Sequence, residues 1–144
     1  MNQHQRDEFD EMVADAIDQL PAAVQALLEE VPVIVEDHPT PEILGELGAD
    51  PEILNDPTSL CGLHTGPMAT ERTVEASGEL PNQIYLFREG IVALAGGWPD
   101  PADPPDAAEQ RLDDIFDEIV TTLLHEIGHQ FGLDEDDLTR LGYE

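Results

Sequence analysis

Three residues near the C-terminal end of the chain have types and a spacing that could do chemistry: His125, Glu126 and His129, in the order His-Glu-x-x-His. Residues four apart lie on one face of a helix, so both imidazole rings can direct a nitrogen at the same ion. Zinc accepts such nitrogens, and a catalytic zinc site uses three protein ligands and keeps the remaining position for water. Because Glu126 adjoins the first histidine, it would reach that water. The pattern predicts a Zn²⁺ site with Glu126 as the catalytic base.

A third protein ligand is expected in the acidic turn that follows the motif. Gly132 can adopt the left-handed conformation that ends a helix and turns the chain back, which would bring a later side chain beside the ion. Glu135 is the preferred third ligand, with Asp134 and Asp136 as alternatives, because it takes the last position of the pattern HExxHxxGxxE. A carboxylate oxygen is an acceptable zinc ligand.

The expected chemistry is hydrolysis of a peptide bond. The ion would acidify a water and polarise the scissile carbonyl, while Glu126 would take the proton and pass it to the leaving amine. His64 and Tyr143 are possible helpers as oxyanion stabiliser or proton donor, although each residue type is more often structural or exposed. The simpler alternative for the motif itself is an amphipathic helix with two solvated histidines.

Charge is the most unusual property of the 144-residue chain. It carries 33 acidic residues against five basic ones, for a net charge of -28. Such a field repels nucleic acid and anionic membranes, so neither is expected as a partner. Adaptation to high salt, a cationic partner or simple lineage bias could each account for the acidity.

The rest of the composition indicates a single domain over residues 1–144, long enough to bury a core. Cys61 is the only cysteine, so no intramolecular disulfide can form, and a lone cysteine is more often a small apolar residue than a nucleophile. The polar N-terminus and the lack of a long apolar run lead us to expect a cytoplasmic location. The sequence does not indicate an oligomeric state.

Apolar periodicity places the motif on the last of several elements. A helix is expected at 106–131, with a core stripe that leaves His125 and His129 to one side: Leu112, Ile115, Phe116, Ile119, Leu123 and Ile127. The other expected elements are helices at 5–19, 21–30 and 41–47, a strand at 31–35 buried on nearly both faces, a weak strand at 59–65, a clear strand at 84–87, and a short final helix through Leu141. The apolar segment 91–95 is of uncertain type, and 66–82 and 96–106 are expected to be loops.

The chain resembles the bacterial zincin-like minimal metallopeptidase family. The resemblance rests on His-Glu-Ile-Gly-His-Gln-Phe-Gly-Leu at 125–133, on the acidic turn that ends Leu-Gly-Tyr at 141–143, and on Leu-Pro-Asn-Gln-Ile-Tyr-Leu-Phe at 80–87. It implies a compact α/β (α+β) fold with a small sheet packed on the active-site helix, zinc on His125 and His129, and the base at Glu126. The family pattern has Asp as the third ligand where this chain has Glu135.

Two functions remain open from the sequence. The first is a zinc metallopeptidase acting on a peptide or protein substrate, in which an edge strand such as 84–87 lines the cleft and pairs with extended peptide. The second is a metal-stabilised acidic binding module with little or no hydrolytic activity. The presence of Glu126 favours the peptidase, because a purely structural metal site gains nothing from a base at that position.

Overall fold

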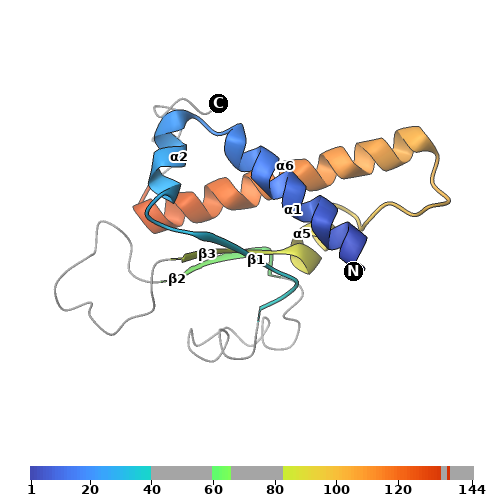
Figure 1. Ribbon diagram of the computed structural model, residues 1–144, viewed down its shortest axis with the longest axis horizontal. Coiled ribbons are helices and arrows are strands. Elements are labelled where there is room, and N and C mark those ends of the chain that lie inside the picture. The colour runs from blue at the N-terminus through green and yellow to red at the C-terminus, as the bar shows by residue number, and fades with distance from the viewer. Residues whose placement is uncertain (40–59, 66–82, 134–135, 137–144) are drawn as a thin grey trace.

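The computed structural model describes residues 1–39, 60–65, 83–133 and 136 (Figure 1). In this part the chain forms four helices and a three-stranded sheet: α1 (Gln3–Asp18), α2 (Ala22–Leu28), β1 (Val33–Glu36), β2 (Gly62–Thr65), β3 (Gln83–Phe87), α5 (Arg88–Leu94) and α6 (Pro105–Phe131). The expected α+β fold class is confirmed. The helix expected at 41–47, the loop expected at 66–82 and the final short helix lie outside the described residues.

The sheet has the strand order β1-β3-β2, so β3 is its central strand. β1 runs parallel to β3, with Val33 opposite Ile84, and β2 runs antiparallel to it, with Gly62 opposite Leu86. The prediction that 84–87 is an edge strand is therefore wrong. Its strongly apolar sequence reflects central placement, since Ile84, Leu86 and Phe87 are fully buried.

β1 also differs from its prediction. The β-branched run at 31–35 indicated a strand buried on nearly both faces, but Val33, Ile34 and Val35 are only half-buried. Among the described strands β1 pairs with β3 alone, which leaves it at an edge of the sheet. β-branched residues suit an extended backbone whether or not both faces are covered, so the run predicted the strand but not its burial.

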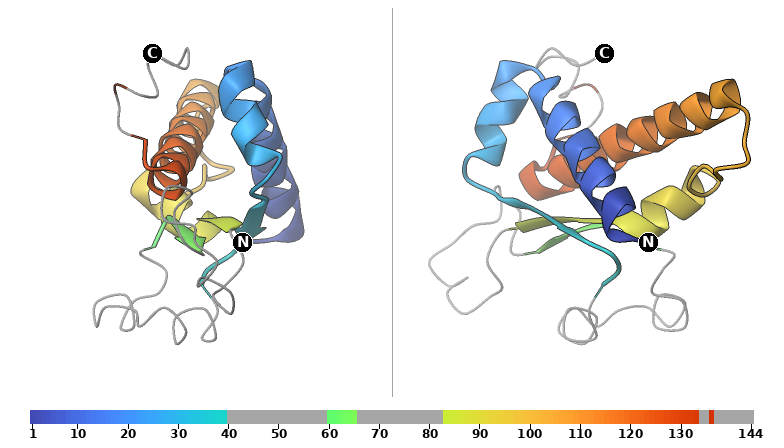
Figure 2. Two further views of the ribbon diagram at one scale, coloured as in Figure 1. Left: turned by 90° about the vertical axis from the view of Figure 1, so that its left-hand side faces the viewer. Right: turned by 45° about the vertical axis from the view of Figure 1, so that its right-hand side comes forward.

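Helix α6 forms the centre of the core (Figure 1). At 1.5 Å per residue, its 27 residues span about 40 Å. The C-terminal half of α6 lies over one face of the sheet (Figure 1). Helix α1 crosses α6 on the same face of the sheet, as both views in Figure 2 show. Four residues of the predicted stripe are fully buried, Ile115, Ile119, Leu123 and Ile127, whereas Leu112 and Phe116 are only partly buried against the core. They pack with Phe9, Val13 and Ala16 of α1 and with the buried residues of β3.

Two helix boundaries show signals that periodicity alone does not give. α1 begins two residues before the predicted start because Asn2 and Gln5 form a capping box, in which each side chain accepts a hydrogen bond from the other residue's backbone amide. The uncertain segment 91–95 belongs to α5, which starts immediately after β3. The backbone amide of Glu89 donates to the carbonyl of Asp37, which ties the start of α5 to the end of β1.

An ion-pair cluster fixes α1 to the same end of the sheet. Arg88 donates to both carboxylate oxygens of Asp10 and to Asp37, while Arg6 donates to Asp37 as well. Burial raises the pKa of the Asp37 carboxyl, but the guanidinium groups of Arg6 and Arg88 outweigh that effect, and the pKa lies below its ordinary value. In the part of the chain that the structure covers, no helix is long and apolar enough to cross a membrane.

Candidate active site

His125 and His129 lie in the last turns of α6, on its exposed side next to the buried stripe. Their Nε2 atoms are 2.9 Å apart, and their rings meet edge to face with centroids 4.3 Å apart. The four-residue spacing thus brings the two imidazoles together as the sequence predicted. Both Nε2 atoms can serve one ion.

This pair fits zinc in its chemistry and its spacing. Two nitrogens bound to one tetrahedral zinc at about 2.0–2.1 Å would lie about 3.3 Å from each other. The observed distance of 2.9 Å between the Nε2 atoms is within half an ångström of that value. Only a small rotation of the rings would therefore separate the nitrogens to the spacing of a zinc site.

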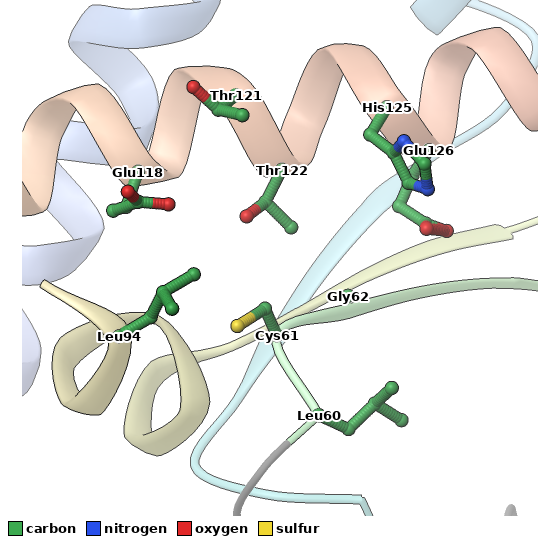
Figure 3. Close-up of a pocket in the computed structure, with 9 residues that line it drawn as sticks. All are labelled: Leu60, Cys61, Gly62, Leu94, Glu118, Thr121, Thr122, His125 and Glu126. Atoms are coloured by element: carbon green, nitrogen blue, oxygen red, sulfur yellow. The ribbon is translucent and has the colours of Figure 1, made fainter.

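Glu126 occupies the side of α6 that faces the sheet. It is only 7% exposed, whereas His125 and His129 on either side are exposed. In Figure 3 its carboxylate lies beside the His125 ring and extends from α6 toward the strands. Charged side chains are rarely buried to this extent without a specific role or partner. The predicted base therefore lies beside His125, on the side of α6 that approaches β2 at Gly62.

Gly62 makes this close approach possible. A Cβ atom on Gly62 would lie 2.6 Å from Cγ2 of Thr122 and 3.1 Å from Cγ of Glu126. The first of these distances is shorter than real Cβ contacts allow, so a larger residue would push β2 away from α6. Glycine at this position lets the strand pass directly beneath Glu126.

Two further glycines shape the end of α6. Gly132 has φ 66° and ψ 33°, the left-handed conformation that was predicted for it, and its amide bonds to the carbonyl of Gly128. The Leu133 amide bonds to the same carbonyl at 2.8 Å. A Cβ on Gly128 would lie 2.9 Å from the Leu133 carbonyl oxygen, so Gly128 gives the returning chain room. The turn that should deliver the third ligand is present up to Leu133.

The other predicted site residues are described only in part. Glu135, Asp134 and Tyr143 lie outside the described residues, so their roles stay predictions. Asp136 is exposed, and within the described ranges no group of three His, Cys, Asp or Glu side chains gathers that could hold a metal. The backbone of His64 lies in β2 opposite Ile84, and its side chain is outside what the structure describes.

A pocket of about 350 Å³ adjoins His125 and Glu126 (Figure 3). It lies between α6, the end of α5 and the residues that lead into β2. Besides the two motif residues it is lined by Leu60, Cys61, Leu94, Glu118 and Thr122, among others. His125 and the candidate base Glu126 therefore open onto a space that can receive part of a substrate.

Sequence reasoning missed most of this lining, although one signal was available. Glu118, Thr122, His125 and His129 follow one another at steps of three and four residues, so they form a second stripe on α6 beside the apolar one. Leu60, Cys61 and Leu94 come from other elements, and their place in the pocket depends on tertiary packing. No local pattern marks them.

Comparison with known proteins agrees with the geometry. The model of the family described as zincin-like metallopeptidase matches residues 28–143, which include β1, all of β2 and β3, and the whole of α6 with its His-Glu-x-x-His motif. No curated protein sequence matches the chain. The family match covers most of the chain, and the chain belongs to the zincin-like metallopeptidase family.

Proposed function

We propose that this protein is a zinc-dependent peptidase in which His125 and His129 hold the ion and Glu126 is the general base. The observation that supports this most strongly is the convergence of the two Nε2 atoms at 2.9 Å, with the buried Glu126 carboxylate beside them at the mouth of a pocket. When bound, zinc would polarise the scissile carbonyl and lower the pKa of a coordinated water.

Glu126 contributes the proton transfers. Its position next to His125 puts its carboxylate at the pocket, where it can take a proton from the attacking water and return it to the leaving amine nitrogen. Its burial keeps the carboxylate in one orientation and limits competing contacts with bulk water. Gly62 keeps this orientation by allowing β2 to support the side chain from below.

Strand β2 is the element best placed to hold an extended substrate. Among the described strands it pairs only with β3. The Phe87 amide donates to the Cys61 carbonyl at 2.8 Å, and antiparallel residues alternate between bonded and non-bonded pairs. Cys61 and Leu63 therefore bond to β3, and the backbone groups of Gly62 and His64 point to the opposite edge. A peptide added there would run past Glu126.

The experiment is a cleavage assay on a mixture of peptides, with mass-spectrometric detection of the products. Zinc-loaded protein should cut a subset of peptides, a chelator should stop the cutting, and added zinc should restore it. Glu126→Gln should lower turnover by about a hundredfold or more, since general base catalysis typically contributes 10²–10⁴-fold. Zinc-loaded protein that cuts no peptide would overturn the peptidase and favour the metal-stabilised binding module.

A further inference from the structure

The pocket beside the motif extends well beyond the residues needed for hydrolysis. It follows α6 from His125 and Glu126 back to Glu118, with Thr122 between them (Figure 3). The seven steps from Glu118 to His125 cover about 10 Å along a helix. With a volume of about 350 Å³, the space is long enough for an extended side chain rather than for a water molecule alone.

The wall of the pocket that faces α6 is mostly apolar. Leu60 and Cys61 come from the residues that enter β2, and Leu94 comes from the end of α5. Leu94 is a large apolar residue that is 64% exposed, which is unusual among the large apolar residues that the structure describes. Burial, and then the charge of Glu118, raises the pKa of the Cys61 thiol, so at neutral pH the thiol is uncharged and acts as part of this wall.

The far end of the pocket carries a negative charge. Glu118 is half-buried and lines the pocket, and it makes no hydrogen bond or ion pair with any residue that the structure describes. The other acid of the pocket, Glu126, lies at the opposite end beside His125. The space therefore combines an apolar wall, which runs from Leu60 to Leu94, with a carboxylate at the end remote from the reaction.

We infer that this pocket binds a long basic side chain, Arg or Lys, of the substrate residue next to the bond that is cut. The inference rests on the proposed function and specifies its substrate class. Arg and Lys have an apolar stem and a charged tip, which match the Leu60–Leu94 wall and the Glu118 carboxylate in that order. An acidic side chain would be repelled by Glu118, and a short side chain would leave the wall and the carboxylate in water.

The charge of the whole chain favours the same partner but does not explain the position of the pocket. A net charge of -28 attracts any cationic peptide and raises its association rate. That attraction depends on peptide charge alone, whereas the Glu118 pocket requires the charge at the tip of a long side chain. Peptides of equal charge and different side-chain length separate the two effects.

The test measures binding in the Glu126→Gln variant, so that no peptide is consumed. Three peptides share one uncharged sequence and differ at a single residue: Arg, norleucine, which keeps only an apolar stem, and diaminopropionate, which has the positive charge on a short stem. Each is measured by fluorescence anisotropy with Glu126→Gln alone, with an added Glu118→Gln, and with an added Asp117→Asn. Asp117 is the matched control, because it is exposed, adjacent in sequence and not part of the pocket.

The Arg peptide should bind about tenfold more tightly than the other two, and Glu118→Gln should remove most of that difference, as expected for loss of one partner of a partly buried ion pair. Asp117→Asn should leave it unchanged. Equal binding of Arg and diaminopropionate peptides, an equal effect of Glu118→Gln on all three, or no binding of any peptide would overturn the inference.

Cleavage by the wild type distinguishes a failure here from a failure of the proposed function. If Arg is moved along an uncharged peptide sequence, the cleaved bond should move with it and stay the same number of residues away from it. Cleavage positions that do not depend on the position of Arg would refute the assignment of the pocket to a basic side chain and leave the peptidase proposal intact. Binding that depends on Glu118 without any chelator-sensitive cut would refute the peptidase and leave the pocket intact.

Discussion

Gly62→Ala tests whether the contact between β2 and α6 positions the base. The added Cβ would lie 2.6 Å from Thr122 Cγ2, about 1 Å closer than an ordinary carbon contact of 3.5–4.0 Å. Thr122 is buried in the helix that forms the core, so it cannot move away freely. Overpacking of this kind costs about 1–3 kcal/mol. For a chain of this length, 1 kcal/mol corresponds to about 4 °C in Tm.

Thr122→Ser provides the matched partner, because serine lacks the Cγ2 methyl that the new Cβ would meet. Alone, this change should cost about 1 kcal/mol for one buried methyl group. Combined with Gly62→Ala it should relieve the overlap, so the double variant should be more stable than the sum of the single effects predicts by about 1–2 kcal/mol. Peptide turnover should recover less than stability, because the 3.1 Å approach to Cγ of Glu126 persists.

The assay is urea unfolding of the wild type, both single variants and the double variant, followed by a double-mutant cycle. The same four proteins are then compared for turnover of one peptide substrate. Strictly additive unfolding free energies would refute the packing argument. Full turnover in Gly62→Ala would refute the view that Gly62 sets the orientation of Glu126.

Two further predictions concern the ends of the elements that hold the site. Asp37→Asn should lower the free energy of unfolding at pH 7 by about 1–3 kcal/mol, because it removes charged hydrogen bonds from Arg6 and Arg88. The pKa of Asp37 lies below its ordinary value of 3.8, so its contribution to stability is complete above that pH and is lost as the pH falls through the lower folded-state pKa. Urea unfolding from pH 7 to pH 2 should therefore show that the variant loses less stability in acid than the wild type does. An equal loss of stability in the two proteins would contradict this. Gly132→Ala should cost about 1–2 kcal/mol, since alanine is strained at φ 66°, and Gly132→Asn should cost less. Equal Tm values for the wild type and Gly132→Ala would show that this turn does not depend on glycine.

The sequence predicted α6 and its motif well because both depend on local spacing. Three- and four-residue steps determine which residues of a helix share a face, so the buried stripe, the convergence of His125 and His129, and the left-handed Gly132 were all accessible from the sequence. The predicted long helix began within two residues of the observed start at Pro105.

Features that depend on how elements assemble were not accessible in the same way. Strand order decides that β3 is central and that β2 lies beneath Glu126, and an apolar strand of five residues does not reveal its neighbours. Gly62 carries no turn signal, because its role is to allow contact with a helix sixty residues later in the chain. The pocket wall likewise combines Leu60, Leu94 and Glu118 from three separate segments.

The central claim is that His125 and His129 hold a catalytic zinc, and metal content per chain tests it most directly. Purified protein should carry one zinc by elemental analysis, Glu126→Gln and the exposed control His4→Ala should retain it, and His129→Ala should lose it. Because Glu126 is assigned to proton transfer, its variant should bind zinc without cutting peptide. Zinc content that is unchanged in His129→Ala, or absent from the wild type after exposure to zinc, would contradict the account.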